Sequence, residues 1–346
     1  RILHVIDALD DQDSARQVQW LTPALQGAGL AVEVCCLGPA TRTATTLSDA
    51  GVNVRTLDWT RWFDPTVPLR LRALVNDTRP DVLHVWGRTA LRMLALVARD
   101  RLQRVVLSGA IPAKGLIPTW DRWLLGKIGC LALIGDSEAR RAARRGVMAN
   151  TTTVLPPALP RAAAPMTPDP FSILWTGRIH PDTGCHAAVG AFDFVRHLYD
   201  ALRLHIVGDG MHATAVRRLI SGLELERHVR MLGTGADASA LMRQAGIVWL
   251  PSFADVGRHV ALEAMAHGRP VVAFAVPSLR ELIADGETGF VVPVGDAVQM
   301  ARRTRVLLDE PALAVELGRA ARAQAESRWP MAHTVSQWRE VYQRVA

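Results

Sequence analysis

Short apolar runs alternate along the chain with longer segments in which apolar residues recur at every third or fourth position. The short runs predict buried strands, and the longer segments predict amphipathic helices. In the first half we expect strands at 2–6, 31–37, 52–56, 82–85, 104–107, 131–134 and 152–155. We expect helices between these strands, near 15–28, 69–76 and 91–98.

A proline-rich segment then interrupts the pattern, with Pro156, Pro157, Pro160, Pro165, Pro168 and Pro170 close together. Proline fixes φ and has no N–H to donate, so this segment is expected to be a linker. Beyond it the alternation resumes, with strands expected at 172–175, 202–207, 229–232, 248–250, 271–274 and 289–292. Helices are expected near 185–199 and 214–223, from about 259, and at the end of the chain, where the last follows Pro330.

This order of elements indicates the α/β class, with two Rossmann-like domains that each contain a parallel sheet covered by helices. The linker places the first domain at 1–160 and the second at 161–325. Ligands of parallel sheets bind beyond the carboxyl ends of the strands. We therefore expect the two domains to face each other across a cleft that holds the active site.

Composition narrows the class of protein further. Of 346 residues, 49% are hydrophobic and 21% are charged, which is ordinary globular usage and excludes a disordered or collagen-like chain. No apolar run approaches the roughly 20 residues that span a bilayer, and the first apolar run leads into acidic residues rather than a signal-peptide cleavage site. The four cysteines lack metal-ligand spacing, so we expect reduced thiols, no metal and a cytoplasmic protein.

The positive charge is concentrated in the first half. Residues 1–165 contain 21 basic and 14 acidic residues and the remainder contains 19 of each, so the net charge of +7 arises entirely before residue 166. This asymmetry indicates either an anionic partner, such as membrane headgroups, or a solvated arginine-rich surface. Trp120 and Trp123 near Lys127 are compatible with a membrane-facing helix or with core packing. We expect no nucleic acid partner, because no recognition motif accompanies the charge.

The strongest chemical signal lies between residues 250 and 273. A strand ends in Pro251-Ser252, a loop contains Asp255 and Gly257, and a helix with Glu263 follows. A helix N-terminus offers free N–H groups and partial positive charge, which suit a diphosphate. A carboxylate on the same segment can accept hydrogen bonds from ribose or sugar hydroxyls.

These residues resemble the family 4 retaining glycosyltransferases of the GT-B fold. That family has Pro-Ser-x-x-Glu-Gly-x-Gly followed by Glu-Ala-Met-Ala-x-Gly-x-Pro-Val, and Asp255 and Glu263 stand at the separation of its two glutamates. Thr176-Gly177-Arg178 resembles the start of its second domain. Further matches are Val207-Gly208-Asp209-Gly210, Val229–Gly233, Glu281–Phe290 and, more loosely, Pro80-Asp81-Val-Leu-His84 and Asp136-Ser137-Glu138.

The resemblance implies transfer of a hexose from a nucleotide-diphosphate donor, with retained anomeric configuration and without metal or another cofactor, in carbohydrate biosynthesis. It implies that Arg178 binds the phosphates, Asp255 lies by the sugar and Glu263 holds the ribose. The other positions that we assign to donor binding are Arg258, Gly257, His259, Gly177, Thr183, Gly208, Gly210 and Leu232, although His259 could equally be a side chain of the helix-capping turn. The acceptor, a glycan, lipid or small molecule, would approach the basic first domain. The charge of that domain and the tryptophans near Lys127, rather than the resemblance, are the grounds for possible peripheral contact with the inner membrane face. The last helix, at 326–346, would cross back onto that domain.

Several positions depart from the family pattern. Thr183 stands where a phosphate-binding lysine is expected, and Arg258 replaces a loop glycine. Arg258 either restores the lost positive charge, since a guanidinium binds phosphate oxygens well, or faces solvent. Trp86 replaces a histidine, and the amino-terminal glycine loop is absent. An alternative function follows, a degenerate and non-catalytic protein that binds a nucleotide or acts as a scaffold.

Overall fold

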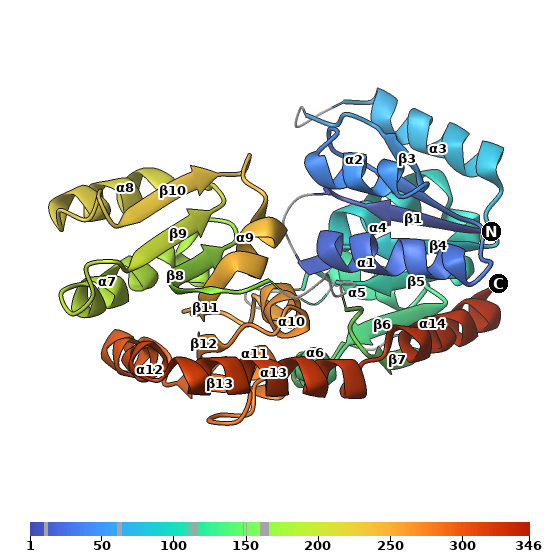
Figure 1. The fold of residues 1–346 in the computed structure, drawn as a ribbon. Coiled ribbons are helices and arrows are strands. Elements are labelled where there is room, and N and C mark those ends of the chain that lie inside the picture. The colour runs from blue at the N-terminus through green and yellow to red at the C-terminus, as the bar shows by residue number, and fades with distance from the viewer. Residues whose placement is uncertain are drawn as a thin grey trace. The chain divides into compact units, whose positions relative to one another are not determined.

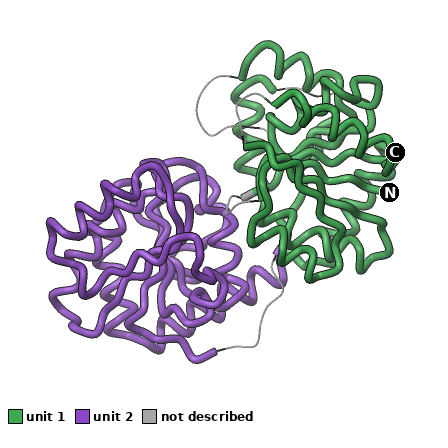
Figure 2. Tube along the Cα trace, turned by 90° about the horizontal axis from the view of Figure 1, so that it is seen from above, with its two compact units in different colours: residues 1–158, 329–346 green, residues 159–328 purple. Residues whose placement is uncertain are grey.

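The computed structural model describes residues 1–9, 13–60, 64–109, 111, 117–147, 149, 151–159 and 166–346. The chain divides into two compact units, 1–158 with 329–346 and 159–328 (Figure 2). Parts of two predicted segments lie outside the described residues: Pro160 and Pro165 of the linker, and Asp10 and Asp11 of the acidic run.

Unit 1 contains a parallel seven-stranded sheet in the order β3-β2-β1-β4-β5-β6-β7 (Figure 1). Its strands are β1 (Ile2–Ile6), β2 (Val32–Cys36), β3 (Asn53–Thr56), β4 (Val82–Trp86), β5 (Val105–Ser108), β6 (Cys130–Ile134) and β7 (Thr152–Leu155). Its helices are α1 (Asp13–Gly27), α2 (Arg42–Asp49), α3 (Thr66–Thr78), α4 (Arg88–Val97), η1 (Arg99–Arg104), α5 (Thr119–Leu125), α6 (Asp136–Arg144) and α14 (Met331–Val345).

Unit 2 contains a parallel six-stranded sheet in the order β10-β9-β8-β11-β12-β13. Its strands are β8 (Asp169–Thr176), β9 (Arg203–Val207), β10 (Val229–Gly233), β11 (Ala245–Leu250), β12 (Val271–Phe274) and β13 (Gly289–Val292). Its helices are η2 (Pro181–Thr183), α7 (Cys185–Arg196), α8 (Ala213–Gly222), α9 (Ala238–Gln244), α10 (Arg258–Ala266), α11 (Pro277–Leu282), α12 (Ala297–Asp309) and α13 (Pro311–Arg328).

Both sheets have the strand order of a Rossmann fold, in which the first strand of the unit lies at the centre and the order reverses beside it. Helices flank the strands of each unit (Figure 1), so the central strands are buried on both faces and their sequences are apolar without alternation. Every residue of β1, β4 and β6 is buried. The predicted α/β class with two Rossmann-like domains is therefore confirmed.

The last helix belongs to unit 1. Trp338, Val341 and Tyr342 of α14 are buried in the same apolar cluster as residues of β1 and β4. The sequence placed the domain changes after 160 and 325, and the structure has them after 158 and 328. The second difference arises because α13 continues unbroken to Arg328.

Candidate functional site

The residues that the sequence assigned to the donor all lie in unit 2, and all but Leu232, which lies within β10, are on segments that follow the carboxyl ends of its strands. The backbone joins these segments directly. Gly177 N–H, after β8, donates to Val207 O at 3.0 Å, and Ile179 N–H donates to Asp209 O at 2.8 Å. Gly208 N–H, after β9, donates in turn to Gly233 O at the end of β10, at 3.0 Å. The ends of three neighbouring strands therefore form one continuous edge.

Two glycines allow this close packing. Gly208 has a φ of 133°, and a Cβ there would lie 1.9 Å from Gly177 O. Gly184 has a φ of 73°, and a Cβ there would lie 1.7 Å from Pro251 O. Both positions require glycine, because φ is positive and the space for a side chain is filled by backbone. Gly184 sets the distance between the segment after β8 and the segment after β11.

The side chain of Thr183 forms hydrogen bonds within its own turn. Its hydroxyl lies 2.7 Å from Arg178 O and 2.8 Å from His180 O, to which it can donate, and it accepts from His180 N–H at 3.2 Å. These bonds close η2 in the manner of a capping box. Thr183 thus shapes the loop that presents the exposed side chain of Arg178, and a lysine in its place would lose these bonds.

The segment after β11 is held from two sides. Phe253 and Ala254 donate their N–H groups to Asp182 O at 2.8 and 3.2 Å. The Asp255 carboxylate accepts from Ser278 N–H, at the start of α11, at 2.6 Å. Asp255 therefore joins the segments that follow β11 and β12, a role that its position in the motif did not reveal. Gly257, with a φ of 92°, caps α10 at its N-terminus.

Three of the assigned side chains lie in the first turns of α10, and all three are buried. Arg258 and His259 are each 8% exposed, and Glu263 is 3% exposed. The Arg258 guanidinium forms an ion pair with the Glu281 carboxylate of α11 at 3.2 Å. The solvent-facing interpretation of Arg258 is therefore wrong, because the α11 carboxylate draws the guanidinium inward. No separate role for Glu281 was predicted, although this residue lies in one of the matched blocks.

Two other side chains at this edge were not assigned from the sequence. Phe253 is partly exposed and stacks on His186 of α7, with ring centroids 5.5 Å apart and planes 6° apart. Burial, followed by the neighbouring His212, lowers the pKa of His186 below its ordinary value. His180 accepts from Asp182 N–H at 3.3 Å, which identifies it as part of the η2 turn.

The remaining assigned residues lie farther along the same edge. Leu232 on β10 is 38% exposed and is separated from β8 by β9. Gly210 packs so closely on Ile179 that a Cβ would lie 2.3 Å from its carbonyl oxygen. Among the described residues, no group of three or more histidine, cysteine or acidic side chains is arranged to hold a metal ion.

Two family models match the chain in succession. The model described as Glycosyl transferase 4-like domain matches residues 14–158, and the model described as Glycosyl transferases group 1 matches residues 170–310. Together they span most of both units.

Curated relatives agree with these models. The chain is 30% identical over 305 residues to phosphatidyl-myo-inositol mannosyltransferase of Mycobacterium leprae, with 82% of this chain and 79% of the relative covered. It is 36% identical over 166 residues to D-inositol 3-phosphate glycosyltransferase of Pseudarthrobacter chlorophenolicus. That match covers 46% of this chain and 40% of the relative.

Solved structures show the same fold over the full length. Anabaena HepE, crystallised with UDP and glucose, superposes with a TM-score of 0.83 at 18% identity and 99% coverage of both chains. Sucrose-phosphate synthase from Thermosynechococcus elongatus superposes with a TM-score of 0.79 at 18% identity, covering 100% of this chain and 99% of that one. At this identity the likeness establishes the fold alone.

Proposed function

The chain belongs to the family 4 glycosyltransferases of the GT-B fold, and from this premise we propose that it transfers a hexose from a nucleoside diphosphate to an acceptor with retention of the anomeric configuration. The donor binds at the carboxyl edge of the unit 2 sheet. The acceptor is approached from unit 1, in which the positive charge of the chain is concentrated.

One observation carries this proposal: the segments after β8, β9 and β11 are hydrogen-bonded into a single edge, and α10 begins at that edge with Arg258, His259 and Glu263 buried in its first turns. A helix N-terminus favours an anion, and the effect is strongest within the first turn. A buried carboxylate one turn further can accept hydrogen bonds from the two ribose hydroxyls.

The chemistry that this edge must support is departure of the diphosphate from the anomeric carbon. Cationic groups that bind the leaving diphosphate more tightly as its charge develops lower the barrier. We assign this role to Arg178 and Arg258, and the proposal requires no metal. Asp255, fixed by its bond to Ser278 N–H, is the acid on the sugar side.

The donor is tested by calorimetric titration of the chain with UDP, GDP and ADP and with their hexose conjugates. UDP is the first nucleotide to test, since HepE was crystallised with UDP, with UDP and glucose and with UDP-glucose. Phosphatidylinositol and inositol phosphate are the first acceptors to test, given the names of the relatives. Proton NMR of the product then reports whether the anomeric configuration is retained.

The scaffold alternative makes a different prediction for the same titration. Two observations favour it. The Thr183 hydroxyl is hydrogen-bonded within its own turn, and the Glu281 carboxylate already forms an ion pair with Arg258. Failure of all three nucleotides to bind, or binding without any turnover across the acceptor panel, would support that alternative and refute the transferase proposal.

Replacement of Glu263 with alanine tests the ribose assignment. A hydrogen bond to a charged group contributes about 1.5–3 kcal/mol, so Kd for the nucleoside diphosphate should rise about ten- to a hundredfold. The comparison is Glu316→Ala, which removes a carboxylate from the exposed face of α13. Binding of inorganic pyrophosphate should change little in Glu263→Ala. An unchanged nucleotide Kd in a folded variant would refute the assignment.

Arg258 and Glu281 offer a paired test of the phosphate assignment. Arg258→Ala should weaken binding of the nucleoside diphosphate by about tenfold or more and leave binding of the nucleoside unchanged, because only the phosphates contact a guanidinium. Glu281→Gln should tighten diphosphate binding, because it removes the carboxylate that competes for Arg258 at 3.2 Å. Equal losses for nucleoside and nucleotide in Arg258→Ala would show that the residue acts only through packing.

A further inference from the structure

Two tryptophans of unit 1 stack on each other at the surface. Trp120 and Trp123 of α5 are 50% and 36% exposed, and their ring centroids lie 4.9 Å apart with planes at 23°. The same helix buries Leu124 and Leu125. The sequence-based interpretation of the tryptophans as core residues is therefore wrong, since it is the leucines that face the core. Leu96, on the neighbouring helix α4, is 71% exposed.

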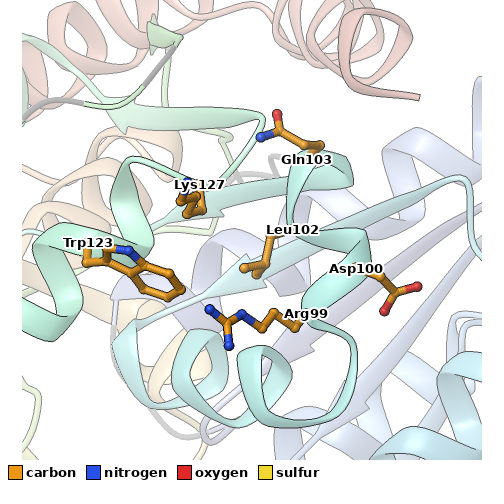
Figure 3. A pocket seen from close by; sticks show the side chains of 6 residues that line it. All are labelled: Arg99, Asp100, Leu102, Gln103, Trp123 and Lys127. Atoms are coloured by element: carbon orange, nitrogen blue, oxygen red, sulfur yellow. The ribbon is translucent and has the colours of Figure 1, made fainter.

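Two cationic side chains lie over the ring of Trp123. The Arg99 guanidinium lies 5.0 Å and the Lys127 ammonium 6.0 Å from the centroid of the Trp123 ring. Arg99, Trp123 and Lys127 line an open pocket of about 320 Å³ together with Asp100, Leu102 and Gln103. Figure 3 shows Arg99 extending toward Trp123, whereas the Asp100 carboxylate points away from the ring. The carboxylate of the lining therefore does not neutralise the two cations.

The pocket lies at the amino-terminal edge of the unit 1 sheet. Arg99 belongs to η1, which leads into β5, and Lys127 precedes β6. A Cβ on Gly129 would lie 2.1 Å from Gln103 O, so the two segments are in backbone contact there. Substrates of parallel sheets bind at the opposite, carboxyl edge. This surface is consequently separate from the site that the proposed reaction would use on unit 1.

We propose that Trp120, Trp123, Leu96, Arg99 and Lys127 form a membrane-binding surface that places unit 1 on a bilayer containing anionic lipids. Indole rings are favoured at the headgroup level of membranes, where one side of the ring is apolar and the other is wet. Arginine and lysine beside them are attracted by anionic headgroups. The surface combines both features on adjoining segments, and its charge is opposite to that of such a bilayer.

A bilayer suits this surface better than a small soluble ligand does. The face of the Trp123 ring is already covered by the protein's own cations, and the lining supplies one neutral hydrogen-bonding side chain, Gln103. Small-molecule sites bury most of their ligand among several placed polar groups. Here two stacked indoles stay exposed, and exposed indoles are side chains that insert shallowly into an interface.

The test is co-sedimentation of the full chain with vesicles of phosphatidylcholine alone and of phosphatidylcholine with about a third phosphatidylglycerol. We expect binding to the anionic vesicles, weakened by salt, and little binding to the neutral ones. Trp120→Ser with Trp123→Ser, and separately Arg99→Glu with Lys127→Glu, should each lower the partition coefficient by about tenfold or more. Arg99→Gln with Lys127→Gln is the milder variant if charge reversal prevents folding.

Matched controls lie in unit 2. Arg217→Glu with Arg218→Glu reverses two exposed charges of α8, and Phe194→Ser with Leu198→Ser removes two exposed apolar side chains. Both controls should bind vesicles as the unchanged chain does. Equal loss in the controls, absence of binding to anionic vesicles, or unchanged binding of the unit 1 variants would overturn the proposal. Release of the bound protein by soluble glycerol phosphate would identify an anion pocket instead and would also overturn it.

Among the described residues, no helix is both long enough and apolar enough to cross a bilayer. The strength of contact through this surface would depend on salt and on lipid charge.

Discussion

Replacement of Gly184 with alanine is expected to destabilise unit 2 by about 2–5 kcal/mol and to abolish nucleotide binding. The new Cβ would stand 1.7 Å from Pro251 O at a backbone with a φ of 73°. The clash is with a carbonyl oxygen and not with a movable side chain, so the backbone must separate. The segment after β11 would then move away from the segment after β8, and Asp255, Gly257 and the start of α10 would move with it.

The measurement is chemical denaturation of the variant together with calorimetric nucleotide binding. Gly190→Ala is the matched control, because Gly190 lies in α7, the helix that Gly184 caps, and has nothing within 4 Å of the position that a Cβ would take. Alanine is favoured over glycine in a helix by about 0.5–1 kcal/mol, so the control should be slightly more stable and should bind normally. Equal stability of the two variants would show that the contact between these segments is not rigid.

Much of the architecture could be predicted because the parallel strands are short, rich in apolar and β-branched residues, and bounded by turns. β1, β7, β12 and β13 have the residue bounds that the sequence indicated. Helix α2 was not predicted, because its sequence, Arg-Thr-Ala-Thr-Thr-Leu-Ser-Asp, contains many residues of low helix propensity. Tertiary packing of Leu47 and the Thr41 cap compensate for that low propensity.

The candidate site could be predicted as a set of positions but not as a set of contacts. The spacing of Asp255 and Glu263 identified the α10 segment from the sequence alone. That spacing contained no information on the partner of Arg258, because Glu281 lies 23 positions away on another helix. The hydrogen bonds of Thr183 within its own turn could likewise not be predicted. The family has a phosphate-binding lysine at this position. Long-range pairing of charges depends on how helices pack, which a one-dimensional pattern does not specify.

A second large effect concerns the interior of unit 1, where two histidines are buried without charge. His84 lies between Tyr342 of α14, whose hydroxyl is 2.8 Å from Nδ1, and Ser108 of β5, whose hydroxyl is 2.9 Å from Nε2. His4 accepts from Trp86 Nε1–H at 3.1 Å. Burial lowers the pKa of His4 to about 3, and burial together with His4 lowers the pKa of His84 well below its ordinary value.

These shifts should make unit 1 unstable in acid. Below the ordinary histidine pKa of 6.5, the unfolded chain binds a proton at each histidine and the folded chain does not, so stability falls as pH falls. Each histidine contributes about 1.4 kcal/mol per pH unit, or about 2.7 kcal/mol for the pair. The loss begins near pH 6.5 and continues toward pH 3, the folded pKa of His4. Above pH 6.5 both histidines are neutral in the folded and in the unfolded chain, so they no longer make the stability of unit 1 depend on pH.

Buried thiols allow the two units to be followed separately. Cys35, Cys36 and Cys130 report on unit 1 and Cys185 reports on unit 2, and all four are free and buried. Burial raises the pKa of Cys35 and of Cys185 to about 12, so these thiols should react with dithiodipyridine only when their unit opens. Labelling in urea, read by peptide mass, should show the unit 1 midpoint falling between pH 6.5 and pH 5 while the unit 2 midpoint changes less.

His4→Gln identifies the cause of the acid sensitivity. Glutamine retains an acceptor for Trp86 Nε1–H and does not titrate, so the pH dependence of unit 1 stability should lose about 1.4 kcal/mol per pH unit. His197→Gln, at an exposed histidine of unit 2, should leave the unit 1 midpoint unchanged at every pH. A unit 1 midpoint that is flat down to pH 5 in the unchanged chain would contradict the assignment of two neutral histidines. His84 joins β4 to Tyr342 of α14, so protonation of His84 would loosen α14 from the sheet. Labelling of the Cys130 thiol should therefore increase together with that of the other unit 1 thiols.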